Sequence, residues 1–348
     1  MKKHFLIVGA GVAGACTAVH LIKSGANVTI IDNNKNVSSR VAAGIINPIV
    51  FRRMTKSWRI DDFLPFLKTF YKEIEEDTSS SFLLNLSIRR LFASKQEQLL
   101  WLEKEGRDDF SPYLERITRE DLDYSGAKNP FGSGRIKEAY CIDVSVFFKS
   151  ITKWIKEHGT IISEEFDYKN LKENTYKGTL YDGIVFCVGH QNKDCKYFEE
   201  LTIEQTKGQL LTIKSKTLPE NVSLNRKCFI LPKGKRLFKI GSTYEWNNPT
   251  TNTTKQGKKN LLENLSYITD ESVSVLHQEA GIRPTTKDRR PMVGTHKTVK
   301  TYHILNGLGA KGYMLAPLIS KEFVDYLMKG VELDPKINIS RYYRRNNT

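Results

Sequence analysis

Residues 4–32, HFLIVGAGVAGACTAVHLIKSGANVTIID, carry a G-x-G-x-x-G motif between an apolar run and a helical pattern. Residues 5–8 are apolar, as expected of a buried parallel strand. Apolar residues recur at helical spacing after the glycines, and residues 28–32 form a second apolar run that ends on an acid. These features in this order predict a complete βαβ unit with a glycine-rich first turn.

The glycines and the acid each suit one part of a dinucleotide. Gly9 permits a tight turn, Gly11 lets the backbone approach a pyrophosphate, and Gly14 lets the helix pack closely on the strand. The helix N-terminus offers N–H groups and a positive dipole end to phosphates. Asp32 can accept hydrogen bonds from both ribose hydroxyls and disfavours a 2′-phosphate. We therefore predict a dinucleotide site, with an ordinary glycine turn as the alternative.

Length and composition fit a globular protein. The 348 residues suffice for two domains or one large discontinuous domain, and 39% are hydrophobic while 27% are charged. The formal net charge of +15 allows a polyanionic partner. A lysine-coated soluble surface is the alternative explanation of that charge.

The cysteines and the N-terminus point to a cytoplasmic protein. The five cysteines form no C-x-x-C pair, which argues for a reducing compartment and for small core residues. The N-terminus has some features of a signal peptide, but its glycines and the following strand fit the βαβ unit better. No segment approaches the roughly 18 apolar residues of a membrane helix, so we expect no membrane association.

The rest of the chain alternates between strand and helix patterns. We expect helices at 60–75, 144–157 (capped by Asp143) and 256–278, and strand then helix over 80–98. Buried strands are expected at 181–189 and 302–305, and antiparallel strands over 201–246 with a hairpin turn at 233–235. Residues 104–138 are expected to be irregular. A second glycine loop, 307–312, precedes a long helix that reaches about residue 328.

These motifs resemble the D-amino-acid oxidase (DAO) superfamily of FAD-dependent flavoproteins. Within this superfamily, the motifs resemble those of glycine oxidases and of the C-terminal flavin domain of the bifunctional enzyme that modifies wobble uridine in tRNA. The resemblance covers nearly the whole length. It rests on the first βαβ unit and on residues 40–44 (RVAAG), 241–245 (GSTYE), 281–284 (GIRP) and 307–312 (GLGAKG) ahead of 315–317 (LAP).

The resemblance implies an α/β fold in which a discontinuous Rossmann-like FAD-binding domain carries an inserted, mostly antiparallel α+β substrate domain. The expected segments are 1–80, 140–200 and 280–348 for the FAD-binding domain, and 81–139 and 201–279 for the substrate domain. Noncovalent FAD is expected, because some relatives attach flavin through a cysteine near the last motif and no cysteine follows Cys228.

The family's motifs also assign site residues. Cofactor-binding positions are Gly9, Gly11, Val12, Ala13, Gly14, Asp32, Asn33, Arg40, Ala42, Ala43, Gly44, Val188, Gly189, Gly309, Lys311, Gly312, Tyr313 and Met314. Catalytic positions are Arg283, Tyr244 and Lys311. No metal site is expected.

Arg283 is expected to hold a substrate carboxylate bidentately, with a structural arginine that bonds loop carbonyls as the alternative. Tyr244 is a candidate for a hydroxyl contact to the substrate, with core packing as its alternative. The last loop departs from the oxidases, because Leu308 stands where they usually have His. Lys311 stands where the tRNA-enzyme domain usually has Arg.

The implied reaction is amine oxidation, in which a hydride passes from the α-carbon to flavin N5 and the imine then hydrolyses. The first hypothesis is an FAD-dependent amine oxidase or dehydrogenase that acts on an amino acid or secondary amine bearing a carboxylate. The second is the same chemistry on carboxymethylaminomethyl-uridine, with tRNA as the partner. The third is a flavin- or tRNA-binding protein without turnover. An NAD-only dehydrogenase is disfavoured because it would not need the second glycine loop.

Overall fold

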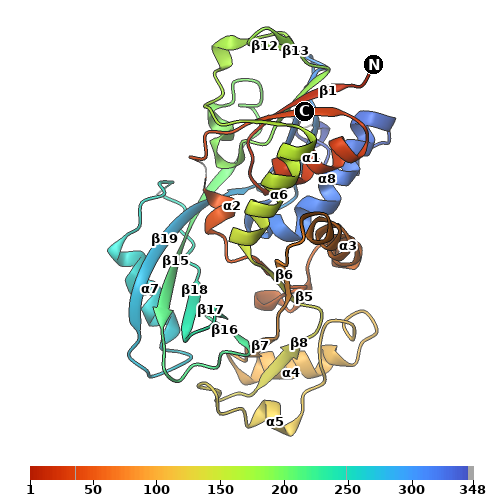
Figure 1. Ribbon diagram of the computed structural model, residues 1–348. Coiled ribbons are helices and arrows are strands. Elements are labelled where there is room, and N and C mark those ends of the chain that lie inside the picture. The colour runs from red at the N-terminus through yellow and green to blue at the C-terminus, as the bar shows by residue number, and fades with distance from the viewer. Residues whose placement is uncertain (36, 248, 344–348) are drawn as a thin grey trace.

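The computed structural model describes residues 1–35, 37–247 and 249–343. A six-stranded, mostly parallel sheet contains the N-terminal strand (Figure 1). Its strand order is β10 (Thr160–Ile162), β2 (Asn27–Ile31), β1 (His4–Val8), β14 (Gly183–Phe186), β21 (Tyr302–Asn306) and β20 (Met292–Thr295). Only the β20–β21 pair is antiparallel. The predicted βαβ unit and the α/β class are confirmed.

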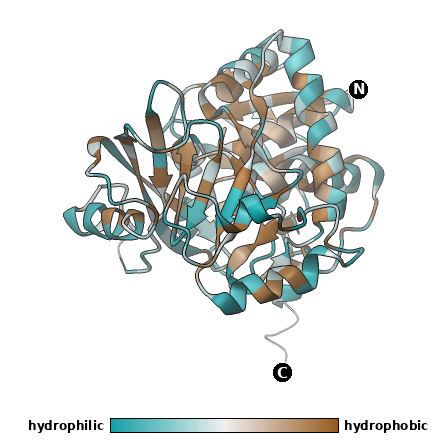
Figure 2. Ribbon diagram, turned by 90° about the horizontal axis from the view of Figure 1, so that it is seen from below, coloured by the Kyte–Doolittle hydropathy of each residue, from teal (hydrophilic) through white to brown (hydrophobic). Residues whose placement is uncertain are grey.

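Strand β1 is buried on both faces, which explains its continuous apolar run. Phe5 and Ile7 face a core formed with the helices, whereas Leu6 and Val8 face a second core on the other side of the sheet. The helical layer consists of α1 (Val12–Lys23), α3 (Ile60–Thr78), α6 (Val144–His158) and α8 (Gly312–Lys329). Figure 2 shows apolar positions on the strands and polar positions on the outer faces of the helices.

A seven-stranded sheet extends away from the first one (Figure 1). Its order is β19 (Ser274–Thr285), β15 (Glu204–Lys214), β18 (Leu237–Gly241), β17 (Cys228–Pro232), β16 (Ser223–Arg226), β7 (Ile88–Leu91) and β8 (Ser133–Ile136). All pairs are antiparallel except β16–β7, and the β17–β18 hairpin turns at the predicted place. Helix α7 (Lys255–Leu265) packs on this sheet. The mostly antiparallel second sheet is thereby confirmed.

Smaller elements connect these layers. They are the sheet of β3 (Ile45–Ile46), β9 (Tyr140–Ile142) and β6 (Leu83–Asn85), the sheet of β11 (Leu171–Lys172), β12 (Thr175–Tyr176) and β13 (Thr179–Leu180), the pair β4 (Ile49–Val50) and β5 (Thr55–Lys56), and the helices α2 (Ser38–Val41), α4 (Lys95–Glu105), α5 (Arg119–Leu122) and α9 (Ser340–Tyr343). Within the described ranges, no helix is both long and apolar enough to cross a membrane.

The predicted helix over 256–278 is wrong in its second half. Helix α7 ends at Leu265, and β19 begins at Ser274. Strand β19 pairs with β15 along its whole length, and Val275 packs against the core of the second sheet. Long-range pairing with β15 therefore overrides the local helical pattern.

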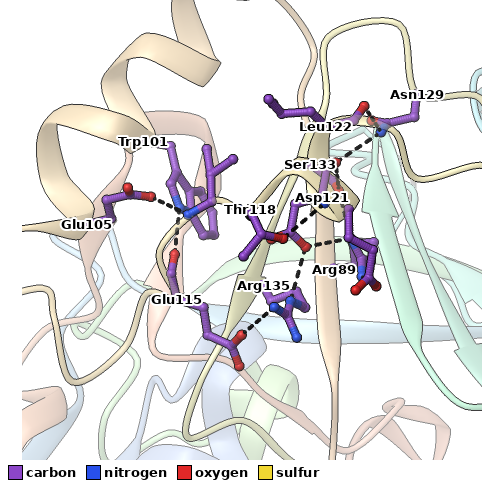
Figure 3. Close-up of polar contacts among 12 residues, drawn as sticks. Arg89, Trp101, Glu105, Glu115, Thr118, Asp121, Leu122, Asn129, Ser133 and Arg135 are labelled. Carbon is purple, nitrogen blue, oxygen red and sulfur yellow. Dashed lines mark hydrogen bonds and ion pairs between the residues drawn. The ribbon is translucent and has the colours of Figure 1, made fainter.

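Residues 104–138 are more ordered than predicted, because they contain α5 and β8 around a buried acid (Figure 3). Asp121 Oδ1 accepts hydrogen bonds from Arg89 Nη1 at 2.8 Å and from Arg135 Nε at 3.0 Å. Thr118 and Asp121 form a capping box at the start of α5. The Asp121 carboxylate thus links α5 to β7 and β8. The charged composition of residues 104–138 does not by itself indicate these contacts.

Candidate functional site

A cavity of about 550 Å³ lies where the carboxyl ends of the parallel strands meet the second sheet. The turn after β1, the end of β2, residues 38–47 and the end of β14 form one part, called here the glycine end. Strands of the second sheet, the 242–244 segment and the 281–284 segment form the arginine end. Residues 308–312 of the last glycine loop also line the cavity. Open α/β sheets bind ligands at such an edge.

Two glycines of the first turn allow contacts that a side chain would block. Gly9 has φ +104°, and a Cβ there would lie 2.6 Å from the Cys187 carbonyl oxygen. A Cβ on Gly14 would lie 1.9 Å from the Gly9 carbonyl oxygen. Gly14 therefore permits close packing of α1 on the turn rather than contact with a ligand, and it does not line the cavity.

The N-terminus of α1 lies at the cavity. Gly11 is the N-cap and has no side chain to cap the helix, and no acidic residue stands in the first turn. Gly11, Val12 and Ala13 all line the cavity. The Val12 N–H donates to Ser39 Oγ at 3.2 Å. N–H groups and a positive dipole end at this place suit an anionic ligand.

Backbone hydrogen bonds hold the Asp32 carboxylate in place at the end of β2. Its Oδ2 accepts from the Ala10 N–H at 2.6 Å, and its Oδ1 accepts from the Asn34 N–H at 2.6 Å. Each carboxylate oxygen keeps a further acceptor site. Asp32 and Asn33 both line the cavity, so these acceptors are available to a ligand's hydroxyl groups.

Most of the other residues predicted to bind cofactor also line the cavity. They are Ala42, Ala43, Gly44, Val188, Gly189, Gly309, Lys311, Gly312 and Tyr313. Arg40 and Met314 lie elsewhere: the exposed Arg40 guanidinium stacks on the Phe148 ring at 4.2 Å, and Met314 is buried in the helical core.

Arg283 lies on β19 and forms the arginine end. Its Nη2 donates to Ser242 Oγ at 2.7 Å and to the Thr243 carbonyl at 3.2 Å, and its Nη1 donates to the Lys207 carbonyl at 3.3 Å. All these acceptors are neutral, and none of the ion pairs among the described residues involves Arg283. Burial lowers the pKa of this guanidinium. A partly buried cation that hydrogen-bonds only neutral groups favours an incoming anion, although the Glu245 carboxylate also acts on its charge.

Strand β15 makes room for the guanidinium. A Cβ on Gly208 would lie 2.1 Å from Arg283 Nη2. On the other side, the Arg283 guanidinium lies 4.2 Å from the centre of the Tyr244 ring. Tyr244 is 62% exposed and lines the cavity, so the alternative of core packing for this residue is wrong.

Lys311 is a second cation on the cavity wall, at the start of α8. Its Nζ donates to the Ser57 hydroxyl, which in turn donates to the Asn47 carbonyl at 3.2 Å. Burial lowers the pKa of Lys311 to about 8. The side chain and the helix N-terminus therefore place positive charge on the same wall.

Sequence reasoning missed several residues of the site. Ser242 follows Gly241 in a motif that the resemblance used, so it could have been found there. Ser57 gives no local signal, because its contact with Lys311 joins residues 254 positions apart. Asn225 and Phe229 line the arginine end from β16 and β17, and only the pairing of these strands brings them there.

Comparisons with known proteins agree with this geometry. The family model DAO, described as FAD dependent oxidoreductase, matches residues 4–326. The uncharacterized oxidoreductase YurR of Bacillus subtilis is 24% identical, over 95% of this chain and 97% of its own length. The glycine oxidase of the same organism is 21% identical, over 94% of each chain.

Solved structures show the same fold. Glycine oxidase from Geobacillus kaustophilus superposes with a TM-score of 0.79 at 19% identity, over 95% of this chain and 96% of that one. Iminodiacetate oxidase from Chelativorans sp. BNC1 superposes with a TM-score of 0.78 at 17% identity, over 96% and 98%.

A longer protein is also similar. The tRNA 5-methylaminomethyl-2-thiouridine biosynthesis bifunctional protein MnmC of Campylobacter concisus is 23% identical over 84% of this chain. The match covers 46% of that protein, so this chain spans about half its length.

Proposed function

This chain belongs to the DAO family of FAD-dependent oxidoreductases, and from that premise we propose that it oxidises the C–N bond of an amino acid or secondary amine that bears a carboxylate. The observation that carries the proposal is the Arg283 guanidinium, which lines the cavity and bonds only neutral acceptors. A guanidinium has five N–H donors, so those that Lys207, Ser242 and Thr243 do not use can make charge-assisted hydrogen bonds to a carboxylate.

The glycine end fits FAD. The close-packed turn at Gly9, the N-terminus of α1 with its glycine N-cap, and the fixed Asp32 carboxylate suit a pyrophosphate and a ribose. The residues that would hold the cofactor there are those predicted from the motif, with Gly14 acting through packing. We propose noncovalent binding, because no cysteine follows Cys228 and the last glycine loop carries no thiol.

Each group at the arginine end has a distinct task. Arg283 would fix the substrate carboxylate and so orient the α-carbon, with Tyr244 closing one face of the guanidinium. FAD, when bound, supplies the acceptor for a hydride. Lys311 and the N-terminus of α8 would stabilise negative charge that develops on a group bound beside them. Phe229 and Leu210 contribute apolar surface to the cavity wall, which would limit the access of water to this end.

Matched amine pairs test this function directly. The holoenzyme would be mixed without oxygen with glycine and methylamine, and with sarcosine and dimethylamine, while the absorption of the oxidised flavin is followed. We expect bleaching only by the carboxylate-bearing member of a pair. Failure of fully loaded enzyme to react with any carboxylate-bearing amine in a wider panel, or equal bleaching by both members, would contradict the proposal.

A second candidate is the same chemistry on carboxymethylaminomethyl-uridine in tRNA. The similarity to MnmC and the exposed Arg52 and Arg53 favour it. The nearby Lys56 and Arg59 add little to this positive charge, because Lys56 pairs with Asp61 and Arg59 pairs with Glu322.

The basic residues near the C-terminus add little to this candidate. Arg341 pairs with Asp288, and residues 344–348 lie outside the described part of the chain. tRNA that carries the carboxymethylaminomethyl group should bleach the flavin, whereas tRNA without it should not. Salt should weaken this reaction steeply, and neutralising Arg52 and Arg53 should slow it more than the reaction with a free amino acid. Bleaching by small amines alone would exclude the tRNA candidate.

A further inference from the structure

The face of β15 opposite Arg283 carries a buried polar network. Gln209 is fully buried and does not line the cavity, although its neighbours Gly208 and Leu210 do. Its Nε2 donates to Glu245 Oε1 at 2.6 Å and to Thr254 Oγ1 at 2.8 Å. Its Oε1 accepts from the Thr254 N–H at 2.9 Å and from Gln278 Nε2 at 2.9 Å. Every hydrogen-bonding site of this amide is therefore used.

The fold leaves room for this amide in the same way as it does for Arg283. A Cβ on Gly257, in the first turn of α7, would lie 2.1 Å from Gln209 Nε2. Gly208 accommodates the guanidinium on one face of β15, and Gly257 accommodates the amide on the other. The two planar groups thus sit back to back across one strand.

Thr243 joins the network to the arginine. Its hydroxyl accepts from the Gln209 N–H at 2.9 Å and donates to Glu245 Oε1 at 2.8 Å. Its carbonyl accepts from Arg283 Nη2 at 3.2 Å. The neighbouring residues Ser242 and Tyr244 supply the other hydrogen bond to Nη2 and the stacked ring.

We propose that Gln209 is a positioning residue for Arg283: its hydrogen bonds to Glu245 and Thr254 hold the 242–245 segment against β15, and that segment fixes the guanidinium. This inference rests on the proposed function, in which Arg283 binds the substrate carboxylate. Buried, fully satisfied networks of this kind restrict a segment to one arrangement. Without the Gln209 side chain, the 242–245 segment keeps its bonds to the backbone of Lys207 and of residue 209, but Glu245 loses the hydrogen bond from the amide.

Two measurements on the holoenzyme test the role of Gln209 without turnover. Acetate serves as the carboxylate probe, and its Kd is read from the change that it causes in the flavin spectrum. Amide hydrogen exchange is followed at Thr243, Glu245 and Thr254. Gln209→Leu should raise the Kd of acetate about tenfold, speed exchange at these amides and leave the FAD content unchanged. Gln256→Leu is the matched control, because Gln256 is exposed on α7 and bonds only Asn260 among the described residues.

A charge-swapped pair separates positioning from a general loss of structure. Gln209→Glu places a second carboxylate against Glu245 and should weaken acetate binding at least as much as Gln209→Leu. Adding Glu245→Gln recreates an amide–carboxylate pair in the opposite order, which should restore the Kd to within about threefold of wild type. Gln278→Leu removes one partner of Gln209 and should have a smaller effect in the same direction.

The outcomes distinguish the positioning role of Gln209 from the carboxylate site and from the proposed reaction. A Kd within twofold of wild type in Gln209→Leu, or no recovery in the swapped pair, would overturn the positioning role. If Arg283→Leu binds acetate as tightly as wild type, the carboxylate site itself fails, and the role of Gln209 toward it fails too. If acetate binding depends on both residues but no carboxylate-bearing amine reduces the flavin, the proposed reaction fails while the positioning role stands.

Discussion

The glycine motif and the acid of the glycine end lie in one continuous stretch, whereas the residues around Arg283 come from segments far apart in the chain. Gly9, Gly11 and Asp32 lie within residues 4–32, and one βαβ unit brings them together. The partners of Arg283, namely Lys207, Ser242 and Thr243, are 40 to 76 positions away. Contacts within one βαβ unit therefore bring together the motif residues of the glycine end. Pairing of distant strands brings together the residues around Arg283. Substitutions at the two ends should separate cofactor binding from substrate binding.

The largest effect is expected from Gly14→Val. A Cβ there would lie 1.9 Å from the Gly9 carbonyl oxygen, which is backbone and cannot move away without opening the turn. We expect a loss of stability of about 3 kcal/mol or more, and loss of FAD with it. Thermal unfolding and FAD content measure both. Gly106→Ala is the control, because nothing lies within 4 Å of a Cβ there and the backbone is αR. Stable, FAD-loaded Gly14→Val protein would contradict the packing argument.

The next largest effect is expected from Arg283→Leu, at the other end. Removal of a charged contact to the carboxylate should cost about 2–5 kcal/mol of substrate or transition-state binding. FAD content should not change, because the partners of Arg283 all belong to the second sheet and its connections. Anaerobic flavin reduction and FAD content are the two readouts. Reduction at the wild-type rate would make Arg283 structural, which is the alternative that its bonds to two backbone carbonyls leave open.

Asp32→Ala should give the reverse pattern with a smaller magnitude. Loss of hydrogen bonds to ribose hydroxyls should weaken FAD binding by about 1–3 kcal/mol. At saturating FAD, the rate of reduction by substrate should equal that of wild type. Equilibrium titration of the FAD-free protein measures the first effect, with the exposed Asp109→Ala as control. Unchanged FAD affinity would show that the contacts of Asp32 with Ala10 and Asn34 are its whole function.

The same contrast explains what could be predicted from sequence. The glycine turn, Asp32 and the parallel strands were predictable, because spacing within 29 residues determines them. Strand β19 was predicted as helix over part of its length, since its partner β15 is invisible to a local pattern. The Asp121 cluster and the Gln209 network depend on contacts across strands and on room left by glycines elsewhere. Family motifs nevertheless indicated Arg283 and Tyr244, because the 241–245 and 281–284 segments retain the spacing of the family.

The smallest expected effect concerns Lys311, which lies on the cavity wall at the start of α8. Because burial lowers its folded-state pKa to about 8 from the ordinary 10.5, the unfolded chain binds more protons between these values. This group should therefore make the FAD-free protein more stable as pH rises from about 8 to 10.5. Its charge, however, is fully present only below about pH 8, so stabilisation of an anion beside it should fade as pH rises through that value.

Sulfite, an anion that adds to flavin, measures this charge. In wild type, the affinity of the holoenzyme for sulfite should fall as the pH rises, and Lys311→Met should remove the part of this fall that Lys311 causes. At pH 7, Lys311→Met should bind sulfite more weakly than wild type by about 1 kcal/mol. Because sulfite itself titrates, the comparison is between variants at each pH. Identical pH profiles would mean that the N-terminus of α8 alone supplies the positive field, and that Lys311 serves to hold Ser57 in place.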